Sequence, residues 1–215
     1  IKFLGCIIQQ DLRWDKQVAE TTKKLRCSSA RIRSEGRLFG PKDRRCLYNA
    51  WCGGILQNNA AVYLPHLNVE QSNKFKGINA GVRAIVGLPK HGISPLTDIR
   101  AGLNIPSVHE VAERSILFEA WKRRQQFLDQ ANYEGPTTRG RHAGDVVAPD
   151  QRAWAGKMTE TKAAIAWNNL PGTVRTQENA SKARHMIKKF LKAKGNLILI
   201  PRDMTRGFLL SHLKD

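Results

Sequence analysis

The chain has 215 residues, of which 41% are hydrophobic, so its composition excludes an intrinsically disordered protein and allows a packed core. It carries 36 Lys and Arg against 18 Asp and Glu, a net charge of +18, which indicates a polyanionic partner such as nucleic acid. No apolar run approaches the ~20 residues that a membrane-spanning helix requires, so we expect no membrane partner.

The amino-terminal segment 2–12 is predicted to be a short strand or hairpin, because strand-forming residues surround Gly5 and a polar turn follows at 9–11. It leads into a helix predicted over 15–35, in which Val18, Leu25 and Ile32 recur every seven residues as an apolar stripe. The opposite side of the helical wheel is basic, with Lys16, Lys23, Lys24 and Arg31 in its middle and Arg26, Arg33 and Arg37 at its flanks.

Further helices are predicted in chain order over 41–51, 69–86, 107–130, 160–167 and 177–194, with a short helical turn at 94–100. The pair Gly53-Gly54 either breaks the helix before it or allows close packing. Ser107 and Glu110 have the spacing of a capping box, the clearest helix start in the chain. The third helix is expected to bury Phe75, Ile78, Val82 and Ile85.

The carboxy-terminal part begins with a Gly- and Pro-containing stretch at 133–156 that predicts a long loop or linker. In the last helix we expect Ala180, Ala183, Ile187 and Phe190 to face inward, and Lys182, Arg184, Lys188, Lys189 and Lys192 to face outward. A short strand is predicted at 197–200. The fold class is therefore mainly α, with a short strand or hairpin before the helices and a short strand near the end.

The sequence shows no self-contained catalytic or metal centre. Its carboxylates are dispersed with no adjacent Asp pair, its histidines are scattered, and no Gly-rich phosphate loop is present. No Cys-x-x-Cys pair occurs among Cys6, Cys27, Cys46 and Cys52, so we expect reduced thiols in an intracellular protein. We predict no catalytic residue, no metal site and no cofactor in this chain.

Among the tryptophans, Trp51, Trp121 and Trp167 lie in apolar periodicity and are predicted to be core residues. Trp14 and Trp154 are freer to stack on bases.

Four segments resemble, in the same order, parts of the reverse transcriptases of jockey-like non-LTR retrotransposons. The start, Lys2-Phe3-Leu4-Gly5-Cys6-Ile7-Ile8 followed by Asp11-Leu12-x-Trp14, is similar to the primer grip that closes the palm and leads into the thumb. Residues 41–50 are similar to the second thumb helix, and 79–88 with 94–96 and 103–106 to the segment after the thumb. The run Trp167-Asn168-x-Leu170-Pro171-x-x-Val174-Arg175 is similar to the motif that closes such proteins.

This resemblance implies a primer-grip-like strand at 1–12, a thumb-like helical bundle at 13–65, a post-thumb helical region at 66–132, a linker at 133–157 and a basic helical segment at 158–215. The fingers and the palm with its Asp pair and Mg²⁺ would lie upstream, so we expect Ile1 to lie inside a longer reading frame. The expected partners are RNA or an RNA–DNA duplex together with that upstream domain, in the nucleus or cytoplasm.

For each group of candidate nucleic-acid-binding residues, a purely structural role is the alternative to binding. By resemblance Phe3, Leu4 and Gly5 would lie near the end of the primer, and the alternative is a buried strand of a small sheet. The basic face of helix 15–35 would hold phosphates, and the alternative is a solvated surface. The residues Lys182, Lys188, Lys189 and Lys192 would contact template RNA, unless the last helix only covers the core.

Two functions therefore fit the sequence. In the first, the chain is the non-catalytic end of an RNA-directed DNA polymerase and positions template and primer. In the second, a domesticated or truncated copy acts as a structural RNA-binding protein in a ribonucleoprotein assembly, for example in an organelle.

Overall fold

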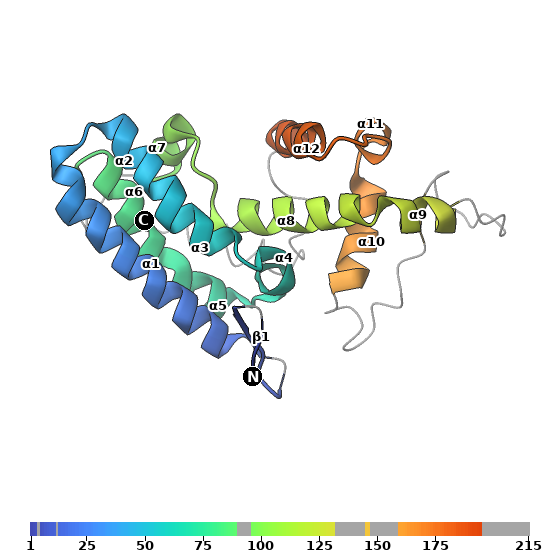
Figure 1. Cartoon of the computed structure of the whole chain (residues 1–215), viewed down its shortest axis with the longest axis horizontal. Helices are drawn as coiled ribbons and strands as arrows, with labels where there is room; N and C mark the ends of the chain where they lie inside the picture. Colours follow the sequence, from blue (N-terminus) through green and yellow to red (C-terminus); the bar gives the residue numbers. More distant parts are fainter. Residues whose placement is uncertain (4, 12, 90–95, 132–144, 147–158, 195–215) are drawn as a thin grey trace, which may run out of the picture. The chain divides into compact units, whose positions relative to one another are not determined.

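The computed structural model describes residues 1–3, 5–11, 13–89, 96–131, 145–146 and 159–194. The described residues are mainly helical, with a two-stranded hairpin before the helices, which confirms the predicted fold class (Figure 1). They form two compact units, Ile1–Val111 and Ala112–Asp215. The expected strand at 197–200 lies outside the described residues, and the five-part division of the chain stays a prediction.

The amino-terminal hairpin consists of β1 (Lys2–Phe3) and β2 (Cys6–Ile7), which pair antiparallel with Lys2 opposite Ile7. Gly5 lies in the turn with φ +82°, a left-handed conformation that glycine adopts without steric cost. Of the two predicted alternatives, a strand or a hairpin, the hairpin is therefore confirmed, because the chain reverses direction at this glycine.

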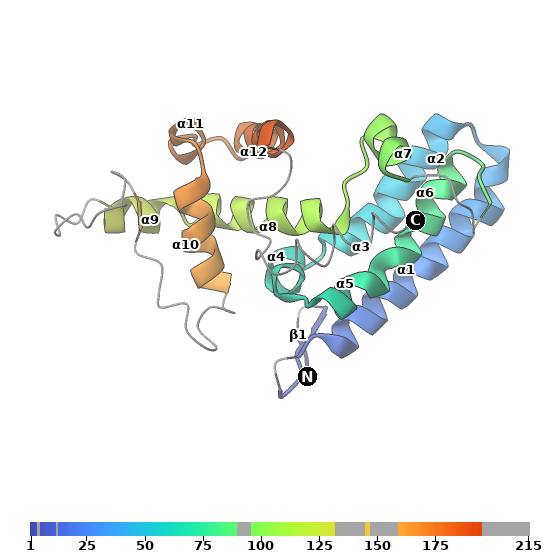
Figure 2. The same ribbon diagram turned by 180° about the vertical axis from the view of Figure 1, so that it is seen from behind.

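Helix α1 (Asp15–Glu35) has the predicted bounds, and its predicted stripe of Val18, Leu25 and Ile32 is buried. The stripe packs against α6 (Ile78–Ile85), which runs beside α1 in both ribbon views (Figures 1 and 2). The four residues predicted to be buried in the third helix, Phe75, Ile78, Val82 and Ile85, are buried.

The predicted helix 69–86 is instead three pieces: α5 (Val69–Lys74), a 3₁₀ turn (Phe75–Gly77) and α6. Near the crossing of α1 and α6, a Cβ added to Gly81 would lie 2.8 Å from the Ser29 hydroxyl and 3.0 Å from the Tyr48 ring. Glycine at this position therefore allows the helices to approach closely.

The predicted second helix extends further than expected. After α2 (Pro41–Tyr48) the chain continues through a π-helix (Asn49–Gly53) into α3 (Gly54–Gln57). Gly53-Gly54 therefore does not break the helix, and the predicted end at Trp51 is wrong. Shorter elements complete the first unit: a 3₁₀ turn (Gly36–Leu38), α4 (Ala60–Tyr63), a 3₁₀ turn (Leu64–His66) and α7 (Leu96–Leu103).

The boundary between the units falls in α8 (Val108–Lys122), whose capping box is confirmed. The Ser107 backbone N–H donates to Glu110 at 2.6 Å, and the Glu110 N–H donates to the Ser107 hydroxyl at 3.2 Å. The predicted helix 107–130 is not continuous, because the helix is interrupted at Arg123 before α9 (Arg124–Ala131) begins. After the interruption Phe127 joins the core, with its ring 5.5 Å from that of Trp167.

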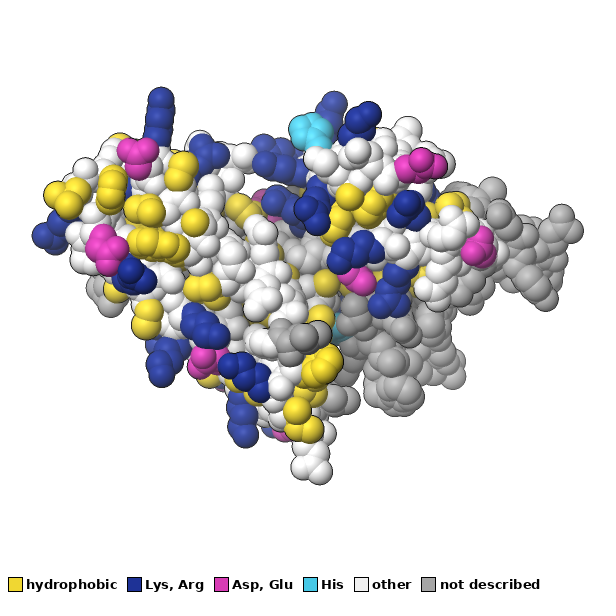
Figure 3. Space-filling model, viewed as in Figure 1, with side chains coloured by type: hydrophobic (Ala, Val, Ile, Leu, Met, Phe, Trp, Pro, Cys, Tyr) yellow, Lys and Arg dark blue, Asp and Glu magenta, His cyan; other side chains and the backbone are white. Residues whose placement is uncertain are grey.

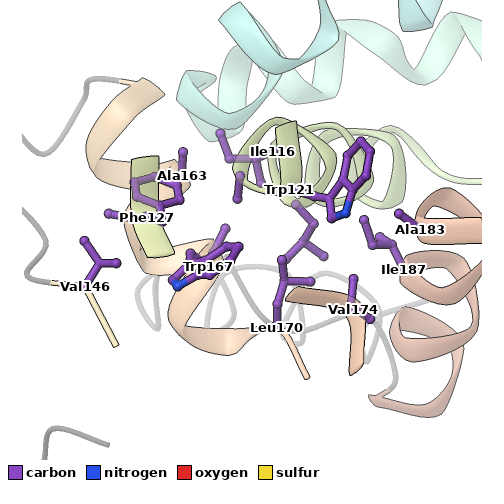
Figure 4. Packing of buried hydrophobic residues seen from close by; sticks show 14 of the residues in the cluster. Ile116, Trp121, Phe127, Val146, Ala163, Trp167, Leu170, Val174, Ala183 and Ile187 are labelled. Atoms are coloured by element: carbon purple, nitrogen blue, oxygen red, sulfur yellow. The ribbon is translucent and has the colours of Figure 1, made fainter. Parts of the chain in front are cut away.

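The second unit is built around two tryptophans. Trp121 and Trp167 are buried among residues of α8, α9, α10 (Thr159–Asn169), α11 (Gly172–Arg175) and α12 (Ala180–Lys194), as Figure 4 shows. The Trp121 indole N–H donates to the Gln177 carbonyl at 2.7 Å, which satisfies the buried polar atom of the ring.

Two polar residues of the run from Trp167 to Arg175 bind residues 145–146, which are distant in the sequence. The Asn168 amide accepts from the Val146 N–H and donates to its carbonyl, both at 2.9 Å. Arg175 pairs with Asp145 at 3.2 Å, and both side chains are largely buried. The motif therefore docks residues 145–146 against the core, which includes the Val146 side chain.

Helix α12 begins three residues later than predicted. The Asn179 side chain accepts from the N–H groups of Ser181 and Lys182, both at 3.0 Å, so it caps the helix. Ala183, Ile187 and Leu191 are buried, whereas Ala180, predicted to face inward, is exposed. Among all the helices that the structure describes, none has the length and apolarity to span a membrane.

Candidate nucleic-acid interface

The basic face of α1 lies at the surface as predicted. Lys16, Lys23, Lys24, Arg26 and Arg31 are all exposed, on the side of the helix away from the buried stripe. Figure 3 shows Lys and Arg side chains along this part of the first unit, interspersed with acidic and hydrophobic ones.

Two of these cations share their charge with carboxylates on the same helix. Lys24 lies 3.4 Å from Glu20, and Arg31 lies 3.2 Å from Glu35. Such exposed pairs contribute about 0–1 kcal/mol, so a phosphate can replace the carboxylate at little cost. Lys16, Lys23 and Arg26 have no carboxylate in ion-pair distance among the described residues.

Arg33, predicted to flank this face, has a different role. Its guanidinium donates to the Leu88 carbonyl at 3.1 Å and to the Ala80 carbonyl at 3.2 Å, so it ties α1 to α6 and to the segment after it. Because these donors are committed inside the fold, we exclude Arg33 from the interface. Arg37 is exposed in the turn that follows α1.

An open groove of about 630 Å³ lies between α1 and the helical segment that contains the π-helix and α3. Gln17, Thr21 and Lys24 line it from α1, and Gly5 lines it from the hairpin. The other wall is formed by Ala50, Trp51, Gly54, Ile55, Gln57 and Asn58. The groove thus contains Lys24 and several side chains that can form hydrogen bonds. Gly5 and Gly54 are exposed beside them, so a ligand could also reach the backbone there.

The hairpin is fixed at this groove by α1. Gln17 accepts a hydrogen bond from the Ile7 N–H at 2.8 Å, and Gln9 accepts one from the Lys16 N–H at 2.7 Å. Of the three predicted hairpin residues, Gly5 lines the groove, Phe3 is 62% exposed, and Leu4 lies outside the described residues. The alternative of a buried strand is therefore wrong for Phe3, because its side chain faces solvent.

Trp51 is half-buried in the groove wall rather than in the core as predicted. The Arg31 guanidinium lies 4.9 Å from the centre of its ring, a cation–π contact that orients the arginine. Trp14, predicted to be freer, is half-buried with its ring 6.3 Å from that of Tyr63. The prediction for Trp154 lies outside the described residues.

The predicted cations of the last helix are in the second unit. Lys182, Lys189 and Lys192 are exposed on α12, and Lys188 is partly buried. These cations belong to the second unit, whereas those of α1 belong to the first.

Burial shifts the pKa of several titratable groups. Burial raises the pKa of the Cys52 thiol to about 11 and that of the Tyr63 hydroxyl to about 12, and it also raises the pKa of Tyr48. Burial lowers the pKa of His109 and of Lys162. Each of these pKa shifts has the direction that burial causes, because a buried group is less stable in its charged form. The shifts therefore indicate packing rather than acid–base chemistry.

The part of the chain that the structure describes contains no group of three or more His, Cys, Asp or Glu side chains placed to hold a metal ion. All four cysteines are free; Cys6 and Cys52 are buried, and Cys27 and Cys46 are exposed. What the described residues offer is a basic, hydrogen-bonding surface suited to an anionic polymer.

Comparisons with models of protein families, with curated protein sequences and with solved structures give no match to this chain.

Proposed function

We propose that the chain binds nucleic acid as the non-catalytic, carboxy-terminal part of an RNA-directed DNA polymerase of the non-LTR retrotransposon type. The observation that carries the proposal is the groove between α1 and α3, which opens beside the hairpin and next to the exposed cations of α1. The resemblance of the hairpin to a primer grip and of the helices to a thumb supports the polymerase context.

In this function α1 provides both packing and binding. Its buried stripe fixes the helix against α6, so the exposed cations are held on a rigid support. Lys23, Lys24 and Arg31 would neutralise phosphates, while groove amides such as Gln57 and Asn58 would donate to phosphate or sugar oxygens. Such contacts position a duplex without reading its sequence, as a polymerase that moves along its template requires.

The test is to reverse the charge of Lys23, Lys24 and Arg31 to Glu in the full chain. We expect weaker binding to RNA–DNA duplexes of every sequence. The log–log slope of affinity against salt should flatten by about 2 to 3, because each lost phosphate contact contributes about 0.7 to 0.9. Fluorescence anisotropy over a salt series measures both quantities.

A matched control makes the same change of charge at Lys42, Lys74 and Lys76, which are exposed outside α1. If both triple variants lose affinity equally, the effect is one of net charge and the proposed interface is wrong. If a folded α1 variant binds as tightly as the unaltered chain, the proposal fails.

The polymerase context has its own test, the intact mass of the native protein from its source. A mass far above 24.2 kDa, together with synthesis of complementary DNA, is the expected result. A native mass near that of this chain would contradict a polymerase and favour the structural RNA-binding protein.

A further inference from the structure

We propose that the second unit carries its own binding surface for a phosphodiester backbone, in which Arg124 and Arg184 are the anchoring residues. The proposal rests on the proposed function for the class of ligand, nucleic acid, but it concerns different residues in a different unit. It starts from four planar side chains that the structure brings together.

Two aromatic rings form the centre of this arrangement. Phe118 and Trp121 lie one turn apart on α8, with their centroids 5.3 Å apart and their planes 14° from parallel. The Arg184 guanidinium of α12 lies 4.3 Å from the centre of the Phe118 ring. The Arg124 guanidinium, at the start of α9, lies 4.6 Å from the centre of the Trp121 ring. We call these four residues the stacked cluster.

Neither arginine of the stacked cluster has a carboxylate within ion-pair distance among the described residues. The nearby cations differ in this respect: Lys122 lies 3.2 Å from Glu119, and Arg123 lies 3.5 Å from the same carboxylate. The local acidic group is therefore already shared by two other cations, and the two stacked guanidinium groups keep their charge for an external anion.

Stacking prepares the two arginines for phosphate. The five N–H donors of a guanidinium lie in one plane and can form paired hydrogen bonds with phosphate oxygens, and a ring contact does not use these donors. Since the ring contact also restricts the side chain, less conformational entropy is lost when an anion binds. An exposed lysine on a mobile stem has neither advantage.

Helix α12 adds positive charge beside the stacked cluster. Helix α12 contains Lys and Arg but no Asp or Glu. Lys182, Lys189 and Lys192 are exposed on it, and no described carboxylate pairs with them. Figure 3 shows Lys and Arg side chains gathered over α8, α11 and α12, with hydrophobic and some acidic side chains among them. Several cations in one region can bind successive phosphates of one nucleic-acid chain, whereas a single small anion would need only one or two of them.

The stacked cluster also indicates how the ligand would be recognised. Trp121 is 4% exposed, and guanidinium groups lie over both rings, so these aromatic faces are not open platforms for bases. The surface would therefore contact phosphates and be indifferent to sequence, unlike binders that stack each base on an exposed ring. Single-stranded RNA and an RNA–DNA duplex share this phosphodiester chemistry.

The test uses the full chain with Arg124 and Arg184 both changed to Gln, which removes two charges at nearly constant side-chain size. Labelled mixed-sequence single-stranded RNA and an RNA–DNA duplex are the probes in separate anisotropy titrations over salt. We expect affinity for at least one probe to fall about tenfold or more and its salt slope to flatten by about 1 to 2. The probe that is affected identifies the source of the phosphates.

Two further variants separate binding from folding and from bulk charge. Arg124→Lys with Arg184→Lys keeps the charge but not the planar donors, so we expect the salt slope to recover while affinity stays below that of the unaltered chain. Lys42→Gln with Lys76→Gln in the first unit makes the same change of charge and should have the smaller effect. Near-ultraviolet circular dichroism of the aromatic residues shows whether the second unit stays folded.

Several outcomes would overturn the inference. One is unchanged affinity in the double Gln variant while the α1 triple variant loses binding, which would leave the proposed function standing. Full recovery of affinity by the double Lys variant would show that planar donors are not needed. If the double Gln variant loses binding to phosphatidylserine vesicles but keeps its affinity for RNA, the surface is assigned to a membrane instead. If the unaltered chain binds neither probe, the proposed function fails as well.

Discussion

Two pairs of arginines, one pair in each unit, are held in different ways. In the first unit, Arg33 and Arg44 donate to backbone carbonyls: Arg33 to Ala80 and Leu88, and Arg44 to Gly36 at 2.7 Å and Phe39 at 2.9 Å. In the second unit, Arg124 and Arg184 lie over aromatic rings, 4.6 and 4.3 Å from a ring centre. The first arrangement occupies part of the N–H donors of each guanidinium, whereas Arg124 and Arg184 make no hydrogen bond with the described residues.

This difference teaches that net charge is a poor measure of binding surface. Of the basic residues that give the chain its charge of +18, those bonded to carbonyls still carry charge but have fewer N–H donors left for a phosphate. The interface must therefore be sought among cations whose N–H donors make no hydrogen bond within the protein. The following changes test the packing and the cations of each unit.

The largest effect is expected from Trp167→Ala in the second unit. The ring is fully buried beside Phe127 and Arg175, so its removal should lower the free energy of unfolding by about 3–5 kcal/mol. Hydrogen exchange during urea unfolding should show lost protection in the second unit and unchanged protection in the first. Trp14→Ala is the comparison, since its half-buried ring lies in the first unit. Equal loss of protection in both units after Trp167→Ala would show that they unfold as one.

A smaller effect is expected from Gly81→Ala in the first unit. The added Cβ would lie 2.8 Å from the Ser29 hydroxyl, closer than ordinary contact, so we expect a loss of about 1–3 kcal/mol by overpacking. Gly54→Ala is the matched control, because its Cβ meets nothing within 4 Å and its backbone is already helical. That variant should gain up to about 1 kcal/mol from helix propensity. Thermal unfolding of the two variants should shift in opposite directions, and a shift in the same direction would contradict the packing argument.

The smallest effect compares two arginines of α1. Arg33→Gln should cost about 1–2 kcal/mol of stability through its lost hydrogen bonds to carbonyls, while leaving the salt slope of RNA binding unchanged. Arg26→Gln should change stability by less than about 0.5 kcal/mol and flatten the slope by slightly less than 1. Urea denaturation and anisotropy on both variants provide the measurement. A flatter slope for Arg33→Gln would return this residue to the interface.

Sequence reasoning succeeded where local pattern decides the structure. The heptad spacing of Val18, Leu25 and Ile32 fixed both the buried and the basic face of α1, and the Ser107 and Glu110 spacing located the start of α8. These features depend on residues within a few turns of one another, so helical periodicity and capping chemistry suffice to predict them.

The groove and the stacked cluster could not be predicted in the same way. Nothing in the run Asn49–Gly53 marks a π-helix, and Gln57 and Asn58 are ordinary polar residues until α3 lies across from α1. Arg184 was expected to face outward, but its ring partner Phe118 lies on a helix far away in the sequence. The run Trp121-Lys122-Arg123-Arg124 was the available signal in the second unit, since it places cations directly after an aromatic residue.

The packing of α1 on α6 has a consequence for how the protein is made. During synthesis α1 leaves the ribosome before α6, and its stripe of Val18, Leu25 and Ile32 stays without its partner until Ile78–Ile85 has also emerged. Over that interval an apolar helix face with a basic back is exposed to other chains and to ribosomal RNA. The order of translation thus gives α1 a period in which its basic side is already present while its apolar stripe still lacks its partner, α6.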